Sequence, residues 1–400
     1  MREITPTPEQ ASALSVINHW LEDKDSMTFS LKGYAGTGKT TILDFVVKQA
    51  EELNLSVLVT ATTNKAVKVL KEKIECNNFS TIHSALNMKL RRKGTKEWFE
   101  PIDYKIPEIQ GYDLVIVDEC SMIGRDLLGF INKYKSSYAK ILYCGDPAQL
   151  QPVEEDGLSE SFNQMNTILL EDIVRYGSEI ELATSTVRES NKEIDLNTIV
   201  NGKEIRFLAK EDLKEFIGFR KDSDRIRYLT FTNNKVMELN KRLRNIDYEG
   251  ANIPKFLVGD RIIANELCKS DENSILLNNS EEGDITEVIE RPDAYQLRVQ
   301  GDESGEAIVN VVIDEYKQVL DDQLQKLIEA KKWKEYYGLK ESYHDIRHCY
   351  AMTTHKSQGS TYETVIVDIE DFNKCRDIKQ RNQLLYVAMT RASKQVIFKV

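Results

Sequence analysis

Gly33-Tyr34-Ala35-Gly36-Thr37-Gly38-Lys39-Thr40 has the spacing G-x-x-x-x-G-K-T and lies between a strand-like apolar run and a helical run. Glycines at these positions allow successive backbone N–H groups to turn toward a phosphate at a helix N-terminus, where the helix dipole also favours negative charge. The stretch therefore predicts a nucleoside triphosphate site, against the alternative of an ordinary glycine-rich turn. In such a site Lys39 reaches the β- and γ-phosphates, and the Thr40 hydroxyl ligates Mg²⁺.

A second apolar run, Leu114-Val115-Ile116-Val117, leads directly into Asp118 and Glu119. An aspartate at the end of a buried strand can hold Mg²⁺ through its water shell, and the neighbouring glutamate can deprotonate an attacking water. Many strands end in acidic residues, so this pattern gains its meaning from the phosphate-binding stretch that precedes it. A third run, 141–144, ends in a polar loop, again at the edge where open α/β sheets bind ligands.

Composition limits what the rest of the chain can be. Its 400 residues, 41% of them hydrophobic, can bury a large core, and this length suggests about two to four domains. The six cysteines form no C-x-x-C pair, and the sequence shows neither a signal peptide nor an apolar run long enough to cross a bilayer. We therefore expect a cytoplasmic protein with no membrane partner.

The net charge argues against a protein that coats nucleic acid, and the spacing of possible metal ligands argues against a zinc site. The net charge of −11 argues against a protein that coats nucleic acid, although it says little about one groove. Basic residues gather between residues 87 and 106 and again from 374 to 399. His344, His348 and Cys349 have no fourth ligand nearby in the sequence, so we expect no zinc site.

Seven motifs follow one another in a fixed order along most of the chain. They are GYAGTGKTT (33–41), TATTNKAVKVL (60–70), STIHSAL (80–86), VDECSM (117–122), GDPAQLQPV (145–153), TTHKSQGSTYE (353–363) and QLLYVAMTRAS (383–393). Weaker matches are TPEQ (7–10) and LEDIVR (170–175). In this order the set resembles the superfamily 1B helicases of the RecD and Dda type.

The resemblance implies an ATPase with its active site in a cleft between two RecA-like domains. The implied catalytic residues are Lys39, Glu119, Gln149, Arg175 and Arg391. The implied nucleotide-binding residues are Gln10, Gly36, Thr37, Gly38, Lys39, Thr40, Thr41, Gln358 and Gly359, with Mg²⁺ held by Thr40 and Asp118. Arg175 and Arg391 would stabilise charge on the transferring phosphoryl group.

Two of these implied roles have an alternative. Gln10 would pair with the N6 and N7 edge of adenine, or it is a solvated glutamine at a helix start. Arg188 competes with Arg175 as the second arginine, although an arginine in its context is more often a solvated helix residue. Gln149 and Gln358 would couple the terminal phosphate to the strand-binding loops.

The resemblance also implies that single-stranded DNA crosses both RecA-like domains. The implied contacts are Thr63, Asn64, Thr81 and His83 in the first domain and Thr354, His355 and Lys356 in the second. Most such contacts join side chains to phosphates, so they position a strand without reading its sequence. The sequence Thr62-Thr63-Asn64 departs from the Pro-Thr-His that relatives often carry, and structural histidines are the alternative for His83 and His355.

The implied fold is α/β, with two RecA-like P-loop NTPase domains, a small β-hairpin insertion and an SH3-like β-barrel insertion. We expect the first RecA-like domain at 1–85 and 112–175, and the second at 176–250 and 346–400. The hairpin would occupy 86–111, and the barrel with a helical extension would occupy 251–345. Short runs bounded by glycine and asparagine at 258–263 and 283–289 favour the barrel, and apolar spacing predicts helix at 314–338.

The insertion at 86–111 is basic and carries Trp98 and Phe99 near its middle. In the family this position holds a pin that splits the duplex, so we expect an aromatic tip that stacks on the last base pair. The alternative is that both rings anchor the insertion on the first domain. The segment that supports the pin in relatives is shorter in this chain.

These features together predict an ATP-dependent helicase that moves 5′ to 3′ on single-stranded DNA and acts at duplex junctions. We expect a monomer, located in the host cytoplasm if a phage encodes it, with replication or recombination proteins as partners. The alternatives are an RNA helicase of the same fold, an ATPase that mainly displaces bound proteins, and a clamp with an inactive ATPase site. The presence of Lys39, Asp118, Glu119 and Arg391 disfavours the clamp.

Overall fold

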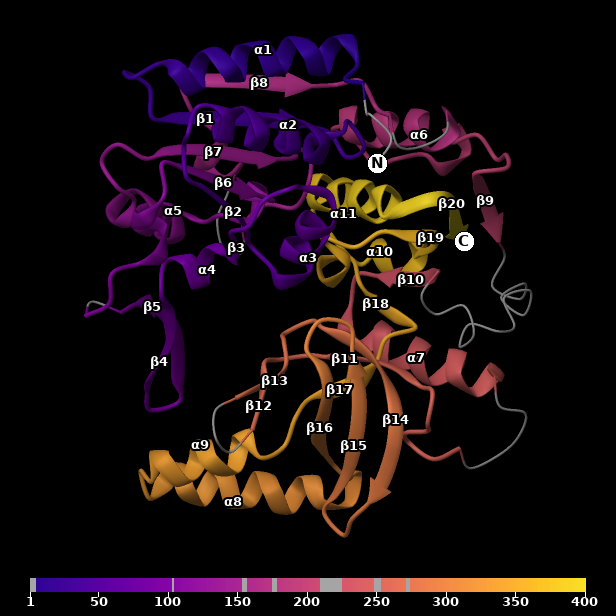
Figure 1. Ribbon diagram of the computed structural model, residues 1–400. Coiled ribbons are helices and arrows are strands. Elements are labelled where there is room, and N and C mark those ends of the chain that lie inside the picture. The colour runs from indigo at the N-terminus through magenta and orange to yellow at the C-terminus, as the bar shows by residue number, and fades with distance from the viewer. Residues whose placement is uncertain are drawn as a thin grey trace.

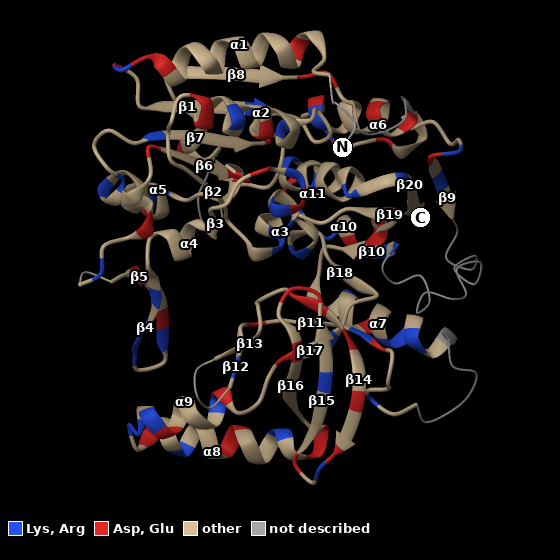
Figure 2. Ribbon diagram, in the orientation of Figure 1, with Lys and Arg blue, Asp and Glu red and all other residues tan. Residues whose placement is uncertain are grey.

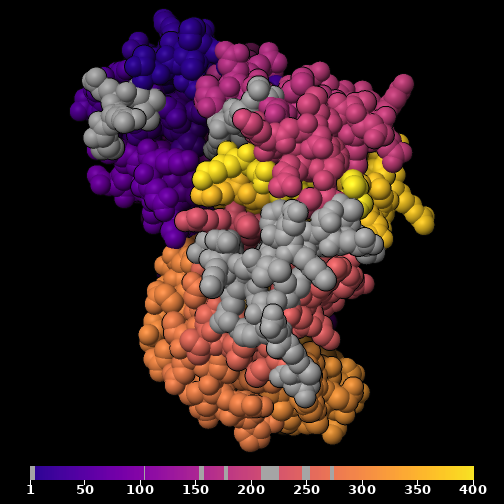
Figure 3. Space-filling model, turned by 90° about the vertical axis from the view of Figure 1, so that its right-hand side faces the viewer, coloured from indigo at the N-terminus to yellow at the C-terminus, as the bar shows by residue number. Residues whose placement is uncertain are grey.

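The computed structural model describes residues 5–102, 104–152, 157–174, 178–208, 225–247, 253–270 and 274–400. Two parallel sheets lie next to each other in the upper part of the molecule, and an antiparallel sheet lies below them (Figure 1). The space-filling view from the side shows the same division, with the orange insertion beneath the two upper lobes (Figure 3).

The first sheet has six parallel strands in the order β3-β2-β6-β7-β1-β8. Its strands are β1 (Thr28–Gly33), β2 (Val57–Ala61), β3 (Phe79–Thr81), β6 (Leu114–Asp118), β7 (Lys140–Gly145) and β8 (Asn166–Leu170). The helices that surround it are α1 (Pro8–Glu22), α2 (Lys39–Glu52), α3 (Asn64–Lys73), α4 (Ile82–Ala85) and α5 (Arg125–Tyr134). Helices α1, α2 and α3 pack on one face, and α4 and α5 pack on the other. Because both faces are covered, the central strands are continuous apolar runs.

The register of this sheet brings the three sequence motifs to one edge. Lys32 of β1 pairs with Gly145 of β7, and Val117 of β6 pairs with Tyr143 of β7. The loops that follow β1, β6 and β7 therefore leave the sheet side by side at its carboxyl edge.

The second sheet has five parallel strands in the order β18-β10-β19-β20-β9. Its strands are β9 (Ile205–Leu208), β10 (Ile226–Thr230), β18 (Ala351–Thr353), β19 (Tyr362–Asp368) and β20 (Ala392–Lys399). Its helices are α6 (Ser178–Glu189), α7 (Asn233–Asp247), α10 (Ile369–Phe372) and α11 (Ile378–Thr390). The prediction of an α/β fold with two RecA-like domains is confirmed by these two sheets and by the structural likeness given below.

The insertion between β10 and β18 is a five-stranded antiparallel sheet in the order β16-β15-β14-β11-β17. Its strands are β11 (Arg261–Ala264), β14 (Glu282–Glu290), β15 (Ala294–Gly301), β16 (Gly305–Val312) and β17 (Ile346–His348), and beside them lie the short pair β12 (Cys268–Lys269) and β13 (Ile275–Leu277). Helices α8 (Lys317–Glu329) and α9 (Trp333–Glu341) follow β16; α8 lies within the range 314–338 expected from spacing, and α9 begins within it and continues to Glu341. We call this unit the insertion domain; its likeness to an SH3 barrel stays a prediction.

Two expectations about the insertions need correction. Strand β17 pairs with β11, so the insertion domain continues past the expected boundary at residue 345. The hairpin β4 (Met88–Lys93) and β5 (Lys96–Pro101) turns at Gly94, whose φ is 62°. Trp98 and Phe99 pair with Arg91 and Leu90 along the strands, so the aromatic residues lie on the shaft of the hairpin and not at its tip.

Candidate active site between the two parallel sheets

The phosphate-binding stretch joins β1 to α2 as a tight loop. Gly36 and Gly38 have φ values of 89° and 84°, in the left-handed region that residues with a Cβ rarely adopt. Gly38 is the N-cap of α2, so Lys39, Thr40 and Thr41 form the first turn of that helix. The positive end of the helix dipole therefore lies at this loop, as an anion-binding site requires.

The ammonium group of Lys39 lies against the same loop. Its Nζ donates to the carbonyl oxygens of Gly33 at 2.7 Å and Tyr34 at 3.1 Å. The Thr37 hydroxyl also donates to the Tyr34 carbonyl, at 2.9 Å. The loop thus holds the lysine charge at the place where the motif predicts phosphates.

Gln10 of α1 is fixed on the phosphate loop. It is 5% exposed, its Nε2 donates to the Thr37 carbonyl at 3.0 Å, and its Oε1 accepts from the Thr7 N–H at 3.0 Å. A Cβ added at Gly38 would lie only 2.4 Å from Gln10 Nε2. The alternative of a solvated glutamine is therefore wrong, whereas pairing with adenine stays a prediction.

Asp118 and Glu119 follow β6 at the carboxyl edge of the first sheet. Burial raises the pKa of the Asp118 carboxyl, which the Lys39 charge opposes. Burial and then the charge of Asp118 raise the pKa of Glu119, while Arg391 and Lys39 oppose the rise. Glu119 has a φ of 52°, a conformation that is uncommon for a residue other than glycine and that is often found at functional sites.

Arg391 brings positive charge to this cleft from the second sheet. It caps the C-terminus of α11 and is buried, and its charge acts on Glu119 of the first domain. Its guanidinium donates to the carbonyl oxygens of Val387 at 3.3 Å and Ser360 at 3.4 Å. These contacts hold the arginine on the second domain while its charge is felt across the cleft.

The two glutamines expected to couple the sites are both buried with one amide atom unpaired. Gln149 Oε1 and Gln358 Nε2 have no hydrogen-bond partner, although buried polar groups are usually paired. Gly359, next to Gln358, has a φ of 75° and lies close to Thr63 and Ala66 of the first domain. The geometry is that of groups which a ligand would complete, and the coupling role stays a prediction.

Arg175 lies outside the described residues. Its competitor Arg188 belongs to α6, and its side chain stacks on Tyr34 of the phosphate loop. The Arg188 guanidinium is 3.6 Å from the ring centroid of Tyr34, and its Nη2 pairs with Glu189 at 3.2 Å. Its Nη1 is buried without a partner, and the side chain is 15% exposed. A solvated helix arginine is therefore the wrong description of Arg188. Sequence reasoning missed this contact because nothing in the pattern of α6 pairs it with Tyr34.

The residues of the cleft fit a magnesium ion. Asp118 and the Thr40 hydroxyl offer hard oxygen ligands beside the phosphate loop, and Mg²⁺ usually takes one or two protein oxygens together with substrate phosphates. Over the described ranges, no three His, Cys, Asp or Glu side chains form a metal site of their own. The donor set thus suits an ion that arrives with a nucleotide.

Two of the residues implied in strand binding on the first domain, Thr63 and His83, line one pocket, whereas Asn64 and Thr81 do not line it. The pocket has a volume of about 360 Å³ and is lined by Thr62, Thr63, His83, Met122, Gly124, Asp126, Leu127 and Pro152. Thr63 and Thr81 also serve as N-caps of α3 and α4, so their hydroxyls accept from backbone N–H groups. Burial lowers the pKa of His83, and its ring meets the edge of Phe99 with centroids 6.0 Å apart. The pocket and the shaft of the hairpin therefore adjoin.

On the second domain the implied strand contacts differ in exposure. Thr354 is fully buried and its hydroxyl donates to the Thr230 carbonyl at 3.3 Å, so it shapes the loop from within. His355 is exposed at the end of this loop. Lys356 Nζ donates to Asn265 of the insertion domain, and burial lowers the pKa of Lys356. None of these placements tests contact with DNA, which stays a prediction.

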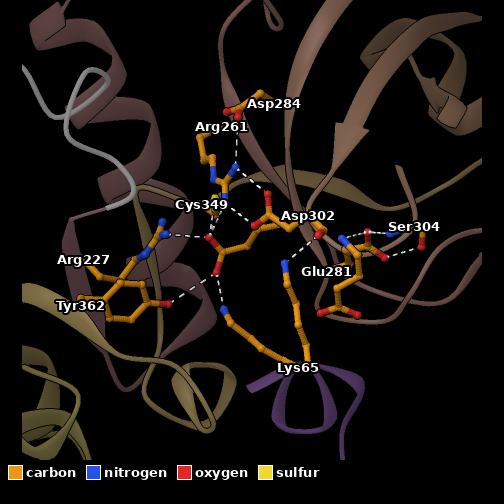
Figure 4. A network of polar contacts seen from close by, with 12 residues as sticks. Lys65, Arg227, Arg261, Glu281, Asp284, Asp302, Ser304, Cys349 and Tyr362 are labelled. Atoms are coloured by element: carbon orange, nitrogen blue, oxygen red, sulfur yellow. Dashed lines mark hydrogen bonds and ion pairs between the residues drawn. The ribbon is translucent and has the colours of Figure 1, made fainter. Parts of the chain in front are cut away.

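The start of α3 is joined to the insertion domain by polar contacts that the motif did not reveal (Figure 4). Asn64 Nδ2 donates to Asn278 Oδ1 at 2.9 Å, and Lys68 Nζ donates to the Asp302 carbonyl at 2.7 Å. Lys65 Nζ lies 2.8 Å from Glu282 Oε1. The implied DNA contact at Asn64 is thus occupied by a contact within the chain.

Glu282 is the point where all three domains meet. Besides Lys65 it pairs with Arg227 of β10 at 2.7 Å and with Arg261 of β11 at 3.6 Å (Figure 4). Burial alone would raise the pKa of Glu282, but Arg227 and Lys65 outweigh it and lower the pKa to about 2. This cluster stabilises the fold only while the Glu282 carboxylate is ionised, because its negative charge compensates the buried cations around it.

Replacing Glu282 by glutamine is expected to reduce the free energy of unfolding by about 3–5 kcal/mol, because the fully buried Arg227 then loses the carboxylate with which it pairs, whereas Arg261 keeps Asp284 and Asp302. Denaturant titration measures the loss. The wild-type carboxylate contributes stability above its ordinary pKa of 4.5, and that contribution is lost as pH falls toward 2. Glu306→Ala, which breaks an exposed pair with Arg298, is the control with an expected loss of about 0–1 kcal/mol. Equal losses in both variants would contradict the proposed weight of Glu282.

Helix α9 supports the hairpin at its tip. The shortness of the supporting segment in the sequence had not shown whether this contact would form. Tyr337 donates its hydroxyl to the Gly94 carbonyl at 2.8 Å, and the Arg92 guanidinium stacks 3.9 Å from the Tyr337 ring centroid. Arg92 also pairs with Glu341 and Glu97. Figure 2 shows basic positions in blue along β4 and both basic and acidic positions along α9. At least one basic residue of the hairpin, Arg92, therefore helps to hold the hairpin in position.

Two protein families and several known proteins resemble this chain. Residues 6–210 match the AAA domain family, and residues 348–398 match the UvrD-like helicase C-terminal domain family. The uncharacterised protein R530 of Acanthamoeba polyphaga mimivirus is 26% identical over 98% of this chain and 99% of its own length. The ATP-dependent DNA helicase dda of Enterobacteria phage T4 is 24% identical over 98% of each chain.

A solved structure shares the fold over the whole chain. The Pif1 helicase from Bacteroides in complex with ADP-AlF3 and ssDNA has a TM-score of 0.58 at 18% identity, covering 100% of this chain and 93% of that one. In the parts of the chain that the structure describes, no helix is long and apolar enough to cross a membrane. The matches to the UvrD-like helicase C-terminal domain, the dda helicase and the Pif1 fold support the resemblance to superfamily 1B helicases of the Pif1, Dda and RecD type, and the chain belongs to the AAA domain family.

Proposed function

We propose that the protein is an ATP-dependent DNA helicase that moves 5′ to 3′ on single-stranded DNA and opens duplex junctions. The observation that carries this proposal is that Lys39 of the first domain and Arg391 of the second domain both place positive charge near Glu119 of the first domain. The family relationship, with a DNA helicase of phage T4 similar over the full chain, supports DNA as the strand.

The residues of the cleft divide the work of phosphoryl transfer. The phosphate loop and Lys39 hold the β- and γ-phosphates, and Mg²⁺, held by Thr40 and Asp118, would neutralise part of their charge. Glu119 accepts a proton from the water that attacks the γ-phosphorus, and ADP departs as its β-phosphate oxygen is released. Arg391 stabilises the charge that develops on the transferring group, and it reaches this place only when the two domains are close.

Strand binding would use the pocket by Thr63 and His83 on the first domain and the loop at His355 on the second. Since Gly359 of the second domain lies close to Thr63 of the first domain, movement of one domain against the other would change the separation of these loops and move the strand. We propose a cytoplasmic monomer, in the host cytoplasm if a phage encodes it, that works with replication or recombination proteins. All six cysteines are free, which suits a reducing compartment.

The decisive experiment compares unwinding of duplexes with a 5′ tail or a 3′ tail, together with ATP turnover on DNA and RNA homopolymers. We expect unwinding only from the 5′ tail and stronger stimulation by DNA. Lys39→Ala, which removes the phosphate-binding ammonium, is the inactive control. Stronger stimulation by RNA would favour the RNA helicase, and stimulation by DNA without unwinding would favour an ATPase that displaces proteins.

Replacing Phe99 by alanine should separate unwinding from translocation. Phe99 is 53% exposed on the hairpin shaft beside His83, and it lies outside every ATPase motif. Because base stacking on an aromatic ring is worth about 1–3 kcal/mol, unwinding should slow by roughly ten- to a hundredfold while most strand-stimulated ATP turnover is kept. Trp98→Ala on the opposite face of the strand is the matched control. Equal loss of both activities would mean that Phe99 holds the first domain together.

A further inference from the structure

Tyr386 places one buried hydroxyl group between the two RecA-like domains. It lies on α11 of the second domain and is 1% exposed. Its hydroxyl accepts from the Ala35 N–H of the phosphate loop at 3.0 Å and donates to Asp146 Oδ2 at 2.8 Å. A single side chain of the second domain thus touches two motifs of the first domain.

The surroundings of this hydroxyl are apolar and buried. Ala35 and Leu150 of the first domain pack within the apolar cluster of the second domain that contains Tyr386. Asp146 is fully buried, and its Oδ1 accepts from the Ala148 N–H at 2.8 Å. Removing the hydroxyl would therefore leave a backbone N–H and a carboxylate oxygen each without this partner in a dry junction.

Helix α11 links this contact to Arg391. Arg391 follows Tyr386 by five positions, which is about 7.5 Å along a helix axis. The residues between them are buried. A packed helix moves as one body, so the position of Tyr386 on the phosphate loop fixes how far Arg391 extends toward the phosphates. Asp146 starts the loop that carries Gln149, so the same hydroxyl also holds that loop.

We propose that Tyr386 is a positioning residue that sets α11, and with it Arg391, against the phosphate loop and the Asp146 loop. Tyr386 itself does not touch the reacting phosphate; it acts through Arg391. Any movement of Ala35 when nucleotide enters the loop is passed to Asp146 and α11 through one hydroxyl. This inference rests on the proposed ATPase function and adds a residue to it.

The test is Tyr386→Phe in the full chain, with Tyr228→Phe as the matched control. Tyr228 also donates a buried hydroxyl to a buried aspartate, Asp368, at 3.2 Å, but within the second domain. ATP turnover is measured with and without a deoxythymidine homopolymer, and thermal unfolding is followed for each variant. Tyr386→Phe should lower stimulated kcat about tenfold with KM for ATP changed less than about threefold, while Tyr228→Phe should keep stimulated kcat.

A second measurement asks whether Tyr386 acts through Arg391. The variant with both Tyr386→Phe and Arg391→Ala should lose no more turnover than Arg391→Ala alone, because the positioned group is already absent. Losses that multiply would overturn the inference, as would stimulated kcat within about twofold of wild type or equal loss in Tyr386→Phe and Tyr228→Phe. A wild-type protein without strand-stimulated turnover would instead contradict the proposed function, so the two failures are distinguishable.

Discussion

Replacing Arg391 by alanine is expected to lower strand-stimulated ATP turnover by about 10³-fold or more. Arg391 is held on the second domain by Val387 and Ser360, while its charge acts on Glu119 of the first. Such an arginine stabilises charge mainly in the transition state, so affinity for ATP should change much less than kcat. Steady-state turnover and binding of a fluorescent ATP analogue measure the two quantities.

Arg381→Ala is the control for this variant. Arg381 lies on the same helix, α11, but pairs with Glu193 at 3.2 Å and with Asn373 at 3.2 Å, both on the second domain. It should keep turnover within about threefold of wild type, because it carries no charge into the cleft. If Arg391→Ala weakened ATP binding as much as it slowed turnover, Arg391 would be a ground-state ligand and not a group of the transition state.

Replacing Glu119 by glutamine is expected to lower turnover by about 10²–10⁴-fold while ATP binding is kept. Glutamine has nearly the same shape but cannot accept the proton of the attacking water. The backbone at Glu119 has a φ of 52°, and a glutamine tolerates this conformation about as well as a glutamate, so the loop should keep its form. Rapid-quench measurement of a single turnover separates this loss from slow product release.

The same residue predicts a pH dependence. Burial and Asp118 raise the pKa of Glu119 above its ordinary value of 4.5, so the ionised form that accepts the proton is lost at a higher pH than for an exposed glutamate. As the pH is lowered, wild-type turnover should therefore begin to fall while the pH is still above 4.5. The residual turnover of Glu119→Gln should not show this fall. Glu160→Gln, at an exposed acid paired with Arg125, should behave as wild type. Weak ATP binding by Glu119→Gln would show that Glu119 is not the base.

Much of this protein could be predicted from short contiguous motifs. The phosphate loop needs its glycines and Lys39 within one strand–loop–helix connection, so local sequence determines that geometry. Asp118 and Glu119 follow from the end of a buried strand in the same way. The order of the motifs was enough to predict two RecA-like domains, and the two parallel sheets confirm that prediction.

Contacts between distant segments were decided only by the tertiary structure. Glu282 reads as an ordinary strand glutamate, yet it meets Lys65, Arg227 and Arg261 because three domains converge on it. The hairpin was expected to end in aromatic rings, but strand register puts Phe99 on the shaft.

The sequence by itself determined which groups this protein uses for phosphate chemistry, because each group sits in a local backbone pattern that needs no distant partner. It could not determine how those groups are brought to one place. Tyr386 and Arg391 belong to one motif, but their interactions with Ala35 and Glu119 arise only when the two domains pack together. That packing depends on the burial of apolar side chains from both domains, a sum over many weak contacts that no single motif encodes.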